Sequence, residues 1–460
     1  MSSGATSDGT PRGATGIADL GPLARQREQR GWYWYDWANS AYVTTVATVM
    51  FAPYLIEVAE AAAVDDRISV VGLSVAPGSL PAYLVTFSTI VSAVLLPPLG
   101  ALADRVANKK GLLGAFAWSG AAFAALLFFC AGDNWQIGAI AAIGANICLA
   151  ASMVVNDSIL PLISEEDERD RVSSRGWAFG YLGGGLLLVA NLVLFLGHDA
   201  FGLTEAMAVR ISMLSAAAWW AGFTLIPFLR LRHHEPVHVV AESGSIVKQS
   251  FGQLHATLRD LRNYPMALTF LLAYLFFNDG IQTVIASASV YGEKELGFET
   301  SVLIGTILLV QFVAFGGALL FGRAAGRYGA KRVILVGILI WMLIVTVALF
   351  LPEKQMVPFL LMGAAIGLVL GGTQALARSY FSLLIPRGKE AEYFSFYHAM
   401  DRGTSWFGTL VFGLVYQFTD SYRPAVFALI AFFAVGGLIL TRVDTARGIR
   451  DAGNVAPAVV

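Results

Sequence analysis

The chain has 460 residues, of which 56% are hydrophobic and only 14% are charged, whereas a soluble globular domain carries roughly 25% charged residues. This composition excludes an ordinary soluble protein, because so much apolar surface could not be hidden in its own core. The formal net charge is -1, so the basic excess that binding to nucleic acid requires is absent, and no nucleic-acid partner is expected.

The first element in chain order is an N-terminal segment, residues 1–33. It is rich in Ser, Gly and Thr near its start, it carries several arginines, and it has no apolar core of the kind found in secretory signals. We predict a flexible cytoplasmic tail here.

Apolar runs follow from Trp37 onward, each about twenty residues long, which is the length that spans a hydrocarbon layer of ~30 Å as a helix. Glycine and proline within these runs are compatible with membrane helices. The expected fold class is therefore an all-α integral membrane protein in contact with the lipid bilayer. We predict twelve transmembrane helices, at 36–56, 81–102, 111–131, 135–158, 175–197, 207–229, 265–290, 301–322, 332–351, 357–378, 392–418 and 424–442.

The distribution of Lys and Arg predicts the orientation. If the N-terminus is inside, the external positions hold only Arg67, Arg210, Lys294, Lys354 and Arg423. These are five of the 31 basic residues, which leaves 26 on the cytoplasmic side. Because cytoplasmic loops retain positive charge, we predict that both termini are cytoplasmic, and that the location is the plasma (inner) membrane if the chain is bacterial.

A long connection, residues 230–263, divides the chain into two six-helix halves, 34–229 and 264–442, and a second cytoplasmic tail follows at 443–460. The connection contains apolar positions at three- and four-residue spacing, which predicts an amphipathic helix. This helix could lie in the membrane interface or dock on the bundle. The positions are Val247, Phe251, Leu254, Leu258 and Leu261.

One loop motif occurs twice, at an offset of 222 residues. The loop after the second span contains Gly100, Asp104, Arg105, Lys109 and Lys110, and the loop after the eighth contains Gly322, Gly326, Arg327, Lys331 and Arg332. Two parallel six-helix repeats build the major facilitator fold, and the motif resembles the signature that this superfamily carries between its second and third helices. Gly326 stands where the first repeat has Asp104, so we do not expect symmetric gating.

Five further motifs are Tyr35-Asp36-Trp37-Ala38-Asn39-Ser40, Asn156 with Leu160-Pro161-Leu162, Gly176 with Gly180-Tyr181-Leu182-Gly183-Gly184, Asp279-Gly280, and the segment 371–379 with Ile385-Pro386. They resemble the unknown major facilitator family, which includes vacuolar, autophagy-linked amino-acid effluxers. The resemblance covers Trp34 to Val443. It implies a secondary active transporter working by alternating access on a small-molecule substrate, with amino-acid efflux as the first expectation, although bacterial-type members can carry other cargo. We expect H+ as the coupling ion and a monomer.

Other chemistries are not expected. The run His234-Glu235-Pro236-Val237-His238 matches a zinc-protease pattern, but Pro236 interrupts the continuous helix that the pattern needs. The phosphate-binding Gly-x-x-x-x-Gly-Lys-Ser/Thr loop and the Gly-x-Ser-x-Gly elbow do not occur. We therefore expect no enzyme, no cofactor and no metal. The alternative is a non-transporting membrane receptor or sensor that binds a metabolite with the same fold.

Ionisable and polar residues at membrane depth are costly and are therefore candidate site residues. Asp279 falls near the middle of the seventh span, and we predict that it lines the transport path, where it binds either the coupling proton or a substrate ammonium group. Asn39 could instead belong to a helix cap, and Asn146 could instead be a hydrogen bond between helices. The full set of substrate or coupling candidates is Asp279, Asn278, Gln282, Asn39, Asn146 and Gln374.

Gating is expected at the cytoplasmic side. Asp157 and Arg378 differ by about the repeat offset (378 − 157 = 221), so we predict that they lie at similar depth and form an ion pair that closes the inner gate. Arg378 and Arg402 could instead extend to the interface, and Asp36 could be a first-turn acid. Further gating candidates are Asp104, Arg105, Lys109, Lys110, Arg327, Lys331 and Arg332, and secondary candidates are Asp36, Asn156, His398, Asp401 and Arg402.

Overall fold

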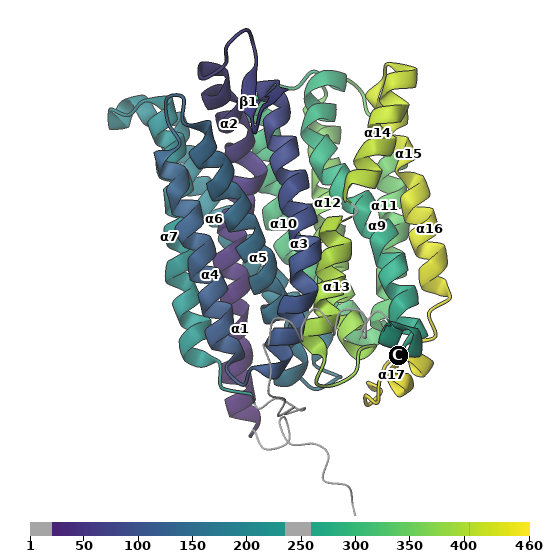
Figure 1. The fold of residues 1–460 in the computed structure, drawn as a ribbon. Helices are drawn as coiled ribbons and strands as arrows, with labels where there is room; N and C mark the ends of the chain where they lie inside the picture. Colours follow the sequence, from purple (N-terminus) through teal and green to yellow (C-terminus); the bar gives the residue numbers. More distant parts are fainter. Residues whose placement is uncertain (1–20, 235–258, 404) are drawn as a thin grey trace, which may run out of the picture.

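The computed structural model describes residues 21–234, 259–403 and 405–460. Within these residues the chain is nearly all helical (Figure 1). Eleven segments of the described residues are long and apolar enough to cross a membrane, and Phe407–Thr419 is a shorter apolar helix. The predicted spans are thus present, but the predicted span 392–418 is divided between two helices, Glu390–Gly403 and Ser405–Thr419, and residue 404 lies outside the described residues.

The N-terminal half begins with a long segment made of α1 (Pro22–Ala41), a π-helical stretch (Tyr42–Met50) and α2 (Phe51–Ala61). An antiparallel hairpin of β1 (Ile68–Val70) and β2 (Leu73–Val75) pairs Ser69 with Ser74 and lies between α2 and α3 in the chain. The remaining spans of this half are α3 (Leu80–Arg105), α4 (Lys109–Leu126), α5 (Trp135–Ile163), α6 (Arg169–Leu196) and α7 (Glu205–Arg230).

The C-terminal half begins with α9 (Pro265–Val290), whose start is favoured by proline at the first helical position. Its other elements are α10 (Thr300–Tyr328), α11 (Ala330–Ala348), α12 (Met356–Leu383), α13 (Glu390–Gly403), α14 (Ser405–Thr419), α15 (Tyr422–Ala428), α16 (Ile430–Thr441) and α17 (Thr445–Asp451).

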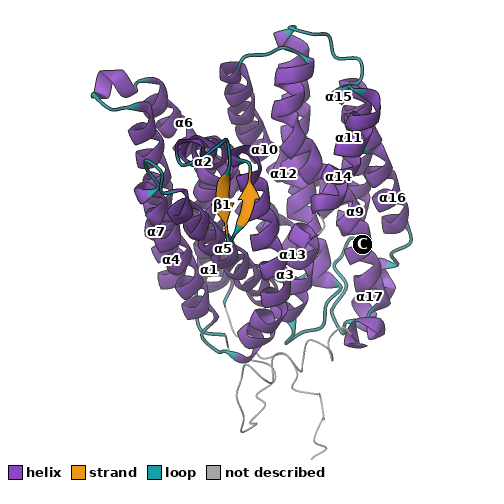
Figure 2. Ribbon diagram, turned by 45° about the horizontal axis from the view of Figure 1, so that its top comes forward, coloured by secondary structure: helices purple, strands orange, loops and turns teal. Residues whose placement is uncertain are grey.

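The bundle has two distinct ends (Figures 1 and 2). We call the end at which α1 begins and α17 lies the termini end. The loops from α3 to α4, from α5 to α6 and from α12 to α13 lie at the same end, because successive spans run in opposite directions. The β-hairpin lies at the opposite end, which we call the hairpin end.

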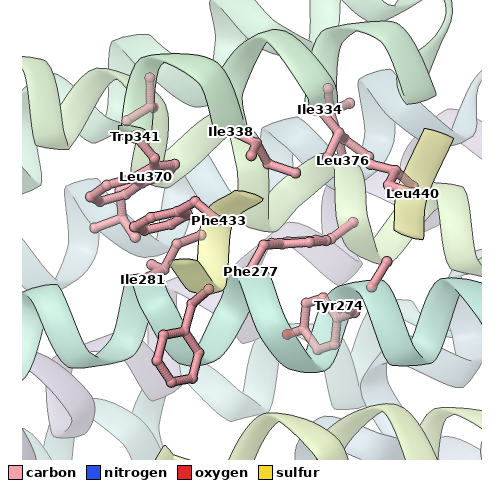
Figure 3. Close-up of a cluster of buried hydrophobic side chains, with 14 of the residues drawn as sticks. Tyr274, Phe277, Ile281, Ile334, Ile338, Trp341, Leu370, Leu376, Phe433 and Leu440 are labelled. Carbon is pink, nitrogen blue, oxygen red and sulfur yellow. The ribbon is translucent and has the colours of Figure 1, made fainter. Parts of the chain in front are cut away.

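Each half has its own hydrophobic core. In the C-terminal half, Trp341 of α11 stacks on Phe433 of α16 with ring centroids 5.7 Å apart, above Phe277 and Ile281 of α9 (Figure 3). The core of the N-terminal half is built around residues such as Trp32 and Trp220, and it also includes Ala391 of α13. The two cores are thus nearly separate, and Ala391 is the one buried residue of the C-terminal half in the N-terminal core as described.

Large apolar side chains also cover the outside of the bundle. Ile140 is 64% exposed and Leu339 is 62% exposed, although both lie within spanning helices. A soluble protein rarely exposes so much contiguous apolar surface, whereas in a bilayer these side chains contact lipid. The chain is therefore a multi-pass integral membrane protein.

The predicted N-terminal tail is too long, because α1 begins at Pro22. The polar residues of its first turns have partners in the bundle. Gln29 Nε2 donates to the Ile163 carbonyl oxygen at 2.9 Å, and Glu28 Oε1 accepts from the Arg232 amide at 2.9 Å. The polar side chains at the start of α1 therefore bind loops of the N-terminal half, and this part of the chain is not a free tail. Residues 1–20 lie outside the described residues.

The predicted C-terminal tail, 443–460, is also packed on the bundle. It contains α17, and Asn454 Nδ2 donates to the carbonyl oxygens of Leu383 and Ile385 at 2.9 and 2.8 Å. These carbonyls lie at the end of α12 and just beyond it, and they need donors from outside the helix. Most of the predicted linker helix lies outside the described residues; Leu261 belongs to a short 3-10 helix (Leu261–Asn263) and is buried.

Candidate functional site

A buried ion cluster joins the two halves toward the termini end. It consists of Asp36 on α1, Asp157 on α5, Arg378 on α12 and His398 on α13, and we call it the inter-half cluster. Its four members are between 1% and 5% exposed. Because each half supplies two members, the cluster is complete only when the halves meet at this end.

Arg378 is the centre of the cluster and uses all of its N–H donors. Nη1 donates to Asp157 Oδ1 at 3.0 Å and to Asp36 Oδ1 at 3.4 Å. Nη2 donates to Asp36 Oδ2 and to the Ser173 carbonyl oxygen, both at 3.0 Å, and Nε donates to Ser173 Oγ at 2.9 Å. The Trp32 indole covers the guanidinium, with 4.6 Å from Cζ to the ring centroid. These contacts fasten α12 to α1, α5 and α6.

His398 binds the second oxygen of Asp157, with Nε2 lying 2.9 Å from Oδ2. The predicted ion pair of Asp157 with Arg378 is thus present, while its role in gating stays a prediction. The alternative interpretations of Asp36 and Arg378 are wrong. Asp36 lies well beyond the first turn of α1, which begins at Pro22, and the buried Arg378 guanidinium is enclosed by protein instead of reaching an interface.

Further hydrogen bonds between the halves surround the cluster. Ala375 and Ser379 belong to the motif segment 371–379, but sequence reasoning did not single out Arg169, Asp170, Ser173 and Ser382, which lie outside the predicted spans. They run from Ser173 Oγ to the Ala375 carbonyl oxygen at 2.7 Å, from Arg169 Nη1 to the Ser382 carbonyl oxygen at 3.1 Å, and from Ser379 Oγ to Asp170 Oδ1 at 2.5 Å.

Asp104, near the end of α3, binds the start of α13. Its Oδ1 accepts from the Ala391 amide at 2.9 Å, its Oδ2 accepts from the Glu392 amide at 2.8 Å, and Lys109 Nζ donates to Oδ1 at 2.9 Å. Amides at the start of a helix have no partner within it, and the helix dipole favours a negative charge there. Asp104 therefore connects the halves by a charge-assisted cap.

The other predicted gating residues have different surroundings. Lys331 Nζ donates to the carbonyl oxygens of Thr441 and Val443 at 3.0 and 2.7 Å, which lie in its own half. Arg332 and Lys331 line a cavity of about 340 Å³ at the termini end. Two of the cations lie near aromatic rings of their own half: Arg327 is 5.6 Å from the Tyr328 ring and Lys110 is 6.0 Å from the Phe228 ring. Arg105 is the last residue of α3.

A second polar cluster lies within the C-terminal half and joins α9, α12 and α13. Asp401 Oδ1 accepts from Asn278 Nδ2 at 2.5 Å, from Gln282 Nε2 at 3.3 Å and from Tyr274 OH at 3.4 Å. Gln374 Nε2 donates to Asn278 Oδ1 at 2.9 Å. We call these residues the amide cluster. The structure thus brings together Asn278, Gln282, Gln374 and Asp401, which the sequence placed on three separate spans.

Asp279 contacts α14 rather than the amide cluster. Its Oδ2 accepts from the Gly408 amide at 2.8 Å. Its Oδ1 and the Thr283 hydroxyl are buried, and within the described residues neither has a hydrogen-bond partner. A β-carbon at Gly408 would lie 2.2 Å from Thr283 Oγ1, so only glycine permits this approach. Sequence reasoning found no structural partner for Asp279, and the structure provides one at the start of a broken helix.

The candidate site residues Asn39, Asn146 and Asn156 have hydrogen-bond partners within the N-terminal half. Asn39 Nδ2 donates to the Tyr35 carbonyl oxygen of its own helix at 2.8 Å. Asn146 Oδ1 accepts from Tyr42 OH at 3.3 Å, which agrees with the packing alternative. Asn156 Nδ2 lies 3.5 Å from Asp36 Oδ1, at the edge of the inter-half cluster. The side chain of Arg402 lies outside the described residues.

A charged pair outside the spanning helices positions the loop before α13. Lys389 Nζ donates to Asp260 Oδ2 at 2.5 Å. Burial raises the pKa of the Asp260 carboxyl, but the hydrogen bonds from Lys389 and Asn263 outweigh it, so the pKa lies below its ordinary value. The pair therefore stays ionised at neutral pH and anchors the start of α13, which carries Ala391 and His398.

Sequence comparison identifies similar proteins over nearly the whole chain. Residues 24–453 match the family described as vacuole effluxer Atg22 like. An MFS-type transporter of Bacillus subtilis is 30% identical over 435 residues, which cover 94% of this chain and 98% of that protein. Autophagy-related protein 22 of Kluyveromyces lactis is 24% identical over 486 residues, which cover 95% of this chain and 97% of that protein.

Solved structures show the same fold. The fucose:proton symporter of Escherichia coli superposes with a TM-score of 0.66 at 14% identity, covering 91% of this chain and 98% of the symporter. The human organic anion transporter MFSD10 superposes with a TM-score of 0.65 at 13% identity, covering 92% of this chain and 100% of that structure. At these identities the likeness concerns the fold alone. The expected twelve-helix arrangement of two six-helix repeats is confirmed.

Proposed function

The chain belongs to the vacuole effluxer Atg22-like family and is a transporter of the major facilitator type, not an enzyme; on this premise we propose that it exports amino acids by proton-driven alternating access. One observation carries the mechanism. Arg378 of one half is bound to Asp36 and Asp157 of the other in a buried site. A static membrane protein has no need of buried ion pairs between halves with separate cores, since burying charge is costly.

The contacts between the halves support rocking as the transport motion. The bonds of the inter-half cluster, its surrounding hydrogen bonds and the Asp104 cap are polar and are concentrated toward the termini end. Polar contacts can be exchanged for water when the halves separate, whereas a shared apolar core could not. Alternating access in this fold is a rocking of one repeat against the other about a central site. The inter-half cluster and Asp104 form the gate that closes the termini end.

The charge distribution supports the proposed orientation in the membrane. Of the 31 basic residues of the sequence, only Arg67, Arg210, Lys294, Lys354 and Arg423 fall in or beside the loops expected at the hairpin end, and basic loops stay in the cytoplasm. The gate therefore closes the cytoplasmic side, both termini are cytoplasmic, and a bacterial protein of this kind resides in the inner membrane. We propose that it acts as a monomer, with both halves of the gate supplied by one chain.

The amide cluster is the proposed substrate site. An amino acid is a zwitterion, and its recognition needs a carboxylate for the ammonium group together with amide donors for the carboxylate group. Asp401 supplies the first, and Asn278, Gln282 and Gln374 supply the second. These groups lie on α9, α12 and α13. In the closed state they satisfy one another, and a substrate would replace part of these hydrogen bonds.

Asp279 is the remaining proposed substrate or coupling residue, and it can be tested separately. Its buried Oδ1 without a described partner could bind a proton, or the carboxylate could turn toward a substrate ammonium group. Asp279→Asn keeps the shape but cannot titrate. Loss of net, pH-driven transport with retained substrate exchange would assign the proton to Asp279. Joint loss of exchange and binding would assign the substrate, and wild-type behaviour would make the residue structural.

The experiment that tests the function is transport in proteoliposomes. Purified protein is reconstituted, a panel of labelled amino acids is supplied, and flux is measured with and without a pH gradient. We expect gradient-driven movement of at least one amino acid. Arg378→Gln should abolish it, whereas Arg171→Gln, which changes an exposed arginine of α6, should not. Substrate binding without flux in the wild type would instead favour a receptor or sensor.

A further inference from the structure

The inter-half cluster has an unbalanced charge. Asp36 and Asp157 contribute two negative charges, and Arg378 contributes one positive charge. Lys109 Nζ lies 3.5 Å from Ser158 Oγ, next to Asp157 in the chain, but it is paired with Asp104 at 2.9 Å. A buried negative charge without compensation is costly. A single proton on the cluster restores neutrality, and His398, which lies 2.9 Å from Asp157 Oδ2, can accept it without weakening either carboxylate's ion pair with Arg378.

We propose that His398 is the proton-binding residue of the gate: it is protonated while the termini end is closed and releases its proton when the halves separate there. This inference rests on the proposed alternating access and names the place where the proton acts. Histidine is the side chain whose charge changes most readily near neutral pH. Closure places the imidazolium against a carboxylate of the other half, so closure and proton binding favour each other.

Opening of the gate removes the carboxylate that stabilises the protonated form of His398. Arg378 and His398 both belong to the C-terminal half, and both are held by Asp157 of the N-terminal half, one on each oxygen. When α5 moves away, two positive groups remain near each other and repel. Proton release relieves this repulsion. The open and closed states therefore differ in the number of bound protons, which is the condition for a pH gradient to drive the transition.

Other titratable groups near His398 could also balance the charge of the cluster, and each has to be considered. Tyr274 and Tyr397 are stacked with centroids 4.1 Å apart and are uncharged at neutral pH, so they cannot balance the cluster. Asp104 is balanced by Lys109. Arg402 follows one turn later in the sequence of α13, and its side chain is outside the described residues. The described titratable groups of this region are Asp36, Asp104, Asp157, Tyr274, Arg378, Tyr397 and Asp401.

The experiment measures closure directly and does not require a known substrate. Full-length protein with Cys130 and Cys148 replaced by alanine carries spin labels at Arg171 of α6 and Arg447 of α17, whose side chains are 54% and 55% exposed. The distance distribution between the labels is recorded in lipid nanodiscs from pH 5 to pH 9. We expect the closed population to dominate at acidic pH. Linkage to one proton changes the closed-to-open ratio by up to about tenfold per pH unit.

Two variants identify the residue. His398→Gln keeps a hydrogen-bonding group but cannot be protonated, so the closed-to-open ratio should no longer depend on pH. Asp36→Asn removes one negative charge, so the cluster is neutral with an uncharged His398, and the pH dependence should shrink while the closed state remains populated. Loss of the pH dependence in Asp36→Asn together with a wild-type response in His398→Gln would instead place the proton on Asp36 and overturn the inference. His198→Gln, at the hairpin end, is the matched control and should respond like the wild type.

Three results would overturn the inference. They are a wild-type pH response in His398→Gln, loss of the response in Asp279→Asn with His398 intact, and loss of the response in Arg402→Gln. The second would place the proton on Asp279, and the third would show that Arg402 controls the charge of the cluster. The failure of amino-acid transport, by contrast, would leave the pH response of the labels unchanged. The proposed function and the proton site are therefore tested separately.

Discussion

The contact between α3 and α13 and the contact between α10 and α6 correspond to each other in the two repeats, yet different chemistry holds them. At the first, Asp104 accepts two amides of α13 and Gly100 lies against the Ala391 backbone. At the second, Gly326 replaces the acid and Gly322 lies against the Ser174 side chain. The fold repeats its backbone but not its charges. The gate is therefore expected to depend much more on the first contact than on the second.

The largest effect is expected for Asp104→Asn. The substitution leaves buried Lys109 without its anion and places an amide donor against the α13 amides. Removing one partner of a buried ion pair costs about 3–5 kcal/mol. Flux in proteoliposomes should fall to near background while the amount of protein in the membrane is unchanged. The exposed Asp199→Asn serves as control, and near-normal flux in Asp104→Asn would show that the charge is dispensable.

The second prediction compares steric fit at the same contact. A β-carbon at Gly100 would lie 2.4 Å from the Ala391 carbonyl oxygen, which is backbone and cannot move aside. Gly100→Ala should therefore hold α3 away from α13 and destabilise the closed state by about 2 kcal/mol, or roughly thirtyfold in population. The label pair at Arg171 and Arg447 should report a larger open fraction. An unchanged distance distribution would mean that α13 shifts without consequence for the gate.

The third prediction applies the same change to the other repeat. A β-carbon at Gly322 would lie 2.5 Å from Ser174 Oγ, which can rotate away, and 2.6 Å from Ser174 Cβ, which cannot, so α6 and α10 would have to move slightly apart. Gly322→Ala should therefore also destabilise the closed state, but by less than Gly100→Ala, because the nearest backbone atom, the Asp170 carbonyl oxygen, lies 3.4 Å away. Gly326→Ala, where the β-carbon would meet open space, is the matched control and should have no effect. A stronger effect at Gly322 than at Gly100 would reverse the proposed ranking of the two contacts.

The fold was predictable from the sequence, because a run of about twenty apolar residues can satisfy its backbone in lipid only as a helix. The pairing of Asp157 with Arg378 followed from the repeat offset. Asp36 and His398 could not be assigned to the same cluster, since nothing in their local sequence indicates which helices meet. The contacts of Glu28 and Gln29 were also hidden, because a docked polar helix and a free polar tail have the same composition. Tertiary partners, rather than local pattern, decide these cases.

The smallest effect is expected at Lys331. It tests whether the basic pair that recurs in the two loops has the same role in both. Lys109 and Lys331 occupy equivalent positions in the two loops, but Lys109 is 4% exposed and neutralises Asp104, whereas Lys331 donates to two carbonyl oxygens of its own half. Lys331→Met should lower the unfolding free energy by about 1 kcal/mol, the net contribution of such hydrogen bonds, and leave flux within about twofold. Lys109→Met should instead resemble Asp104→Asn, because it leaves the buried carboxylate without a cation. Thermal unfolding in detergent and flux in proteoliposomes separate the two outcomes. Equal loss of flux in both variants would indicate that Lys331 also contributes to the gate, through an interaction that forms only when the termini end is open. The two repeats would then differ in the closed state alone.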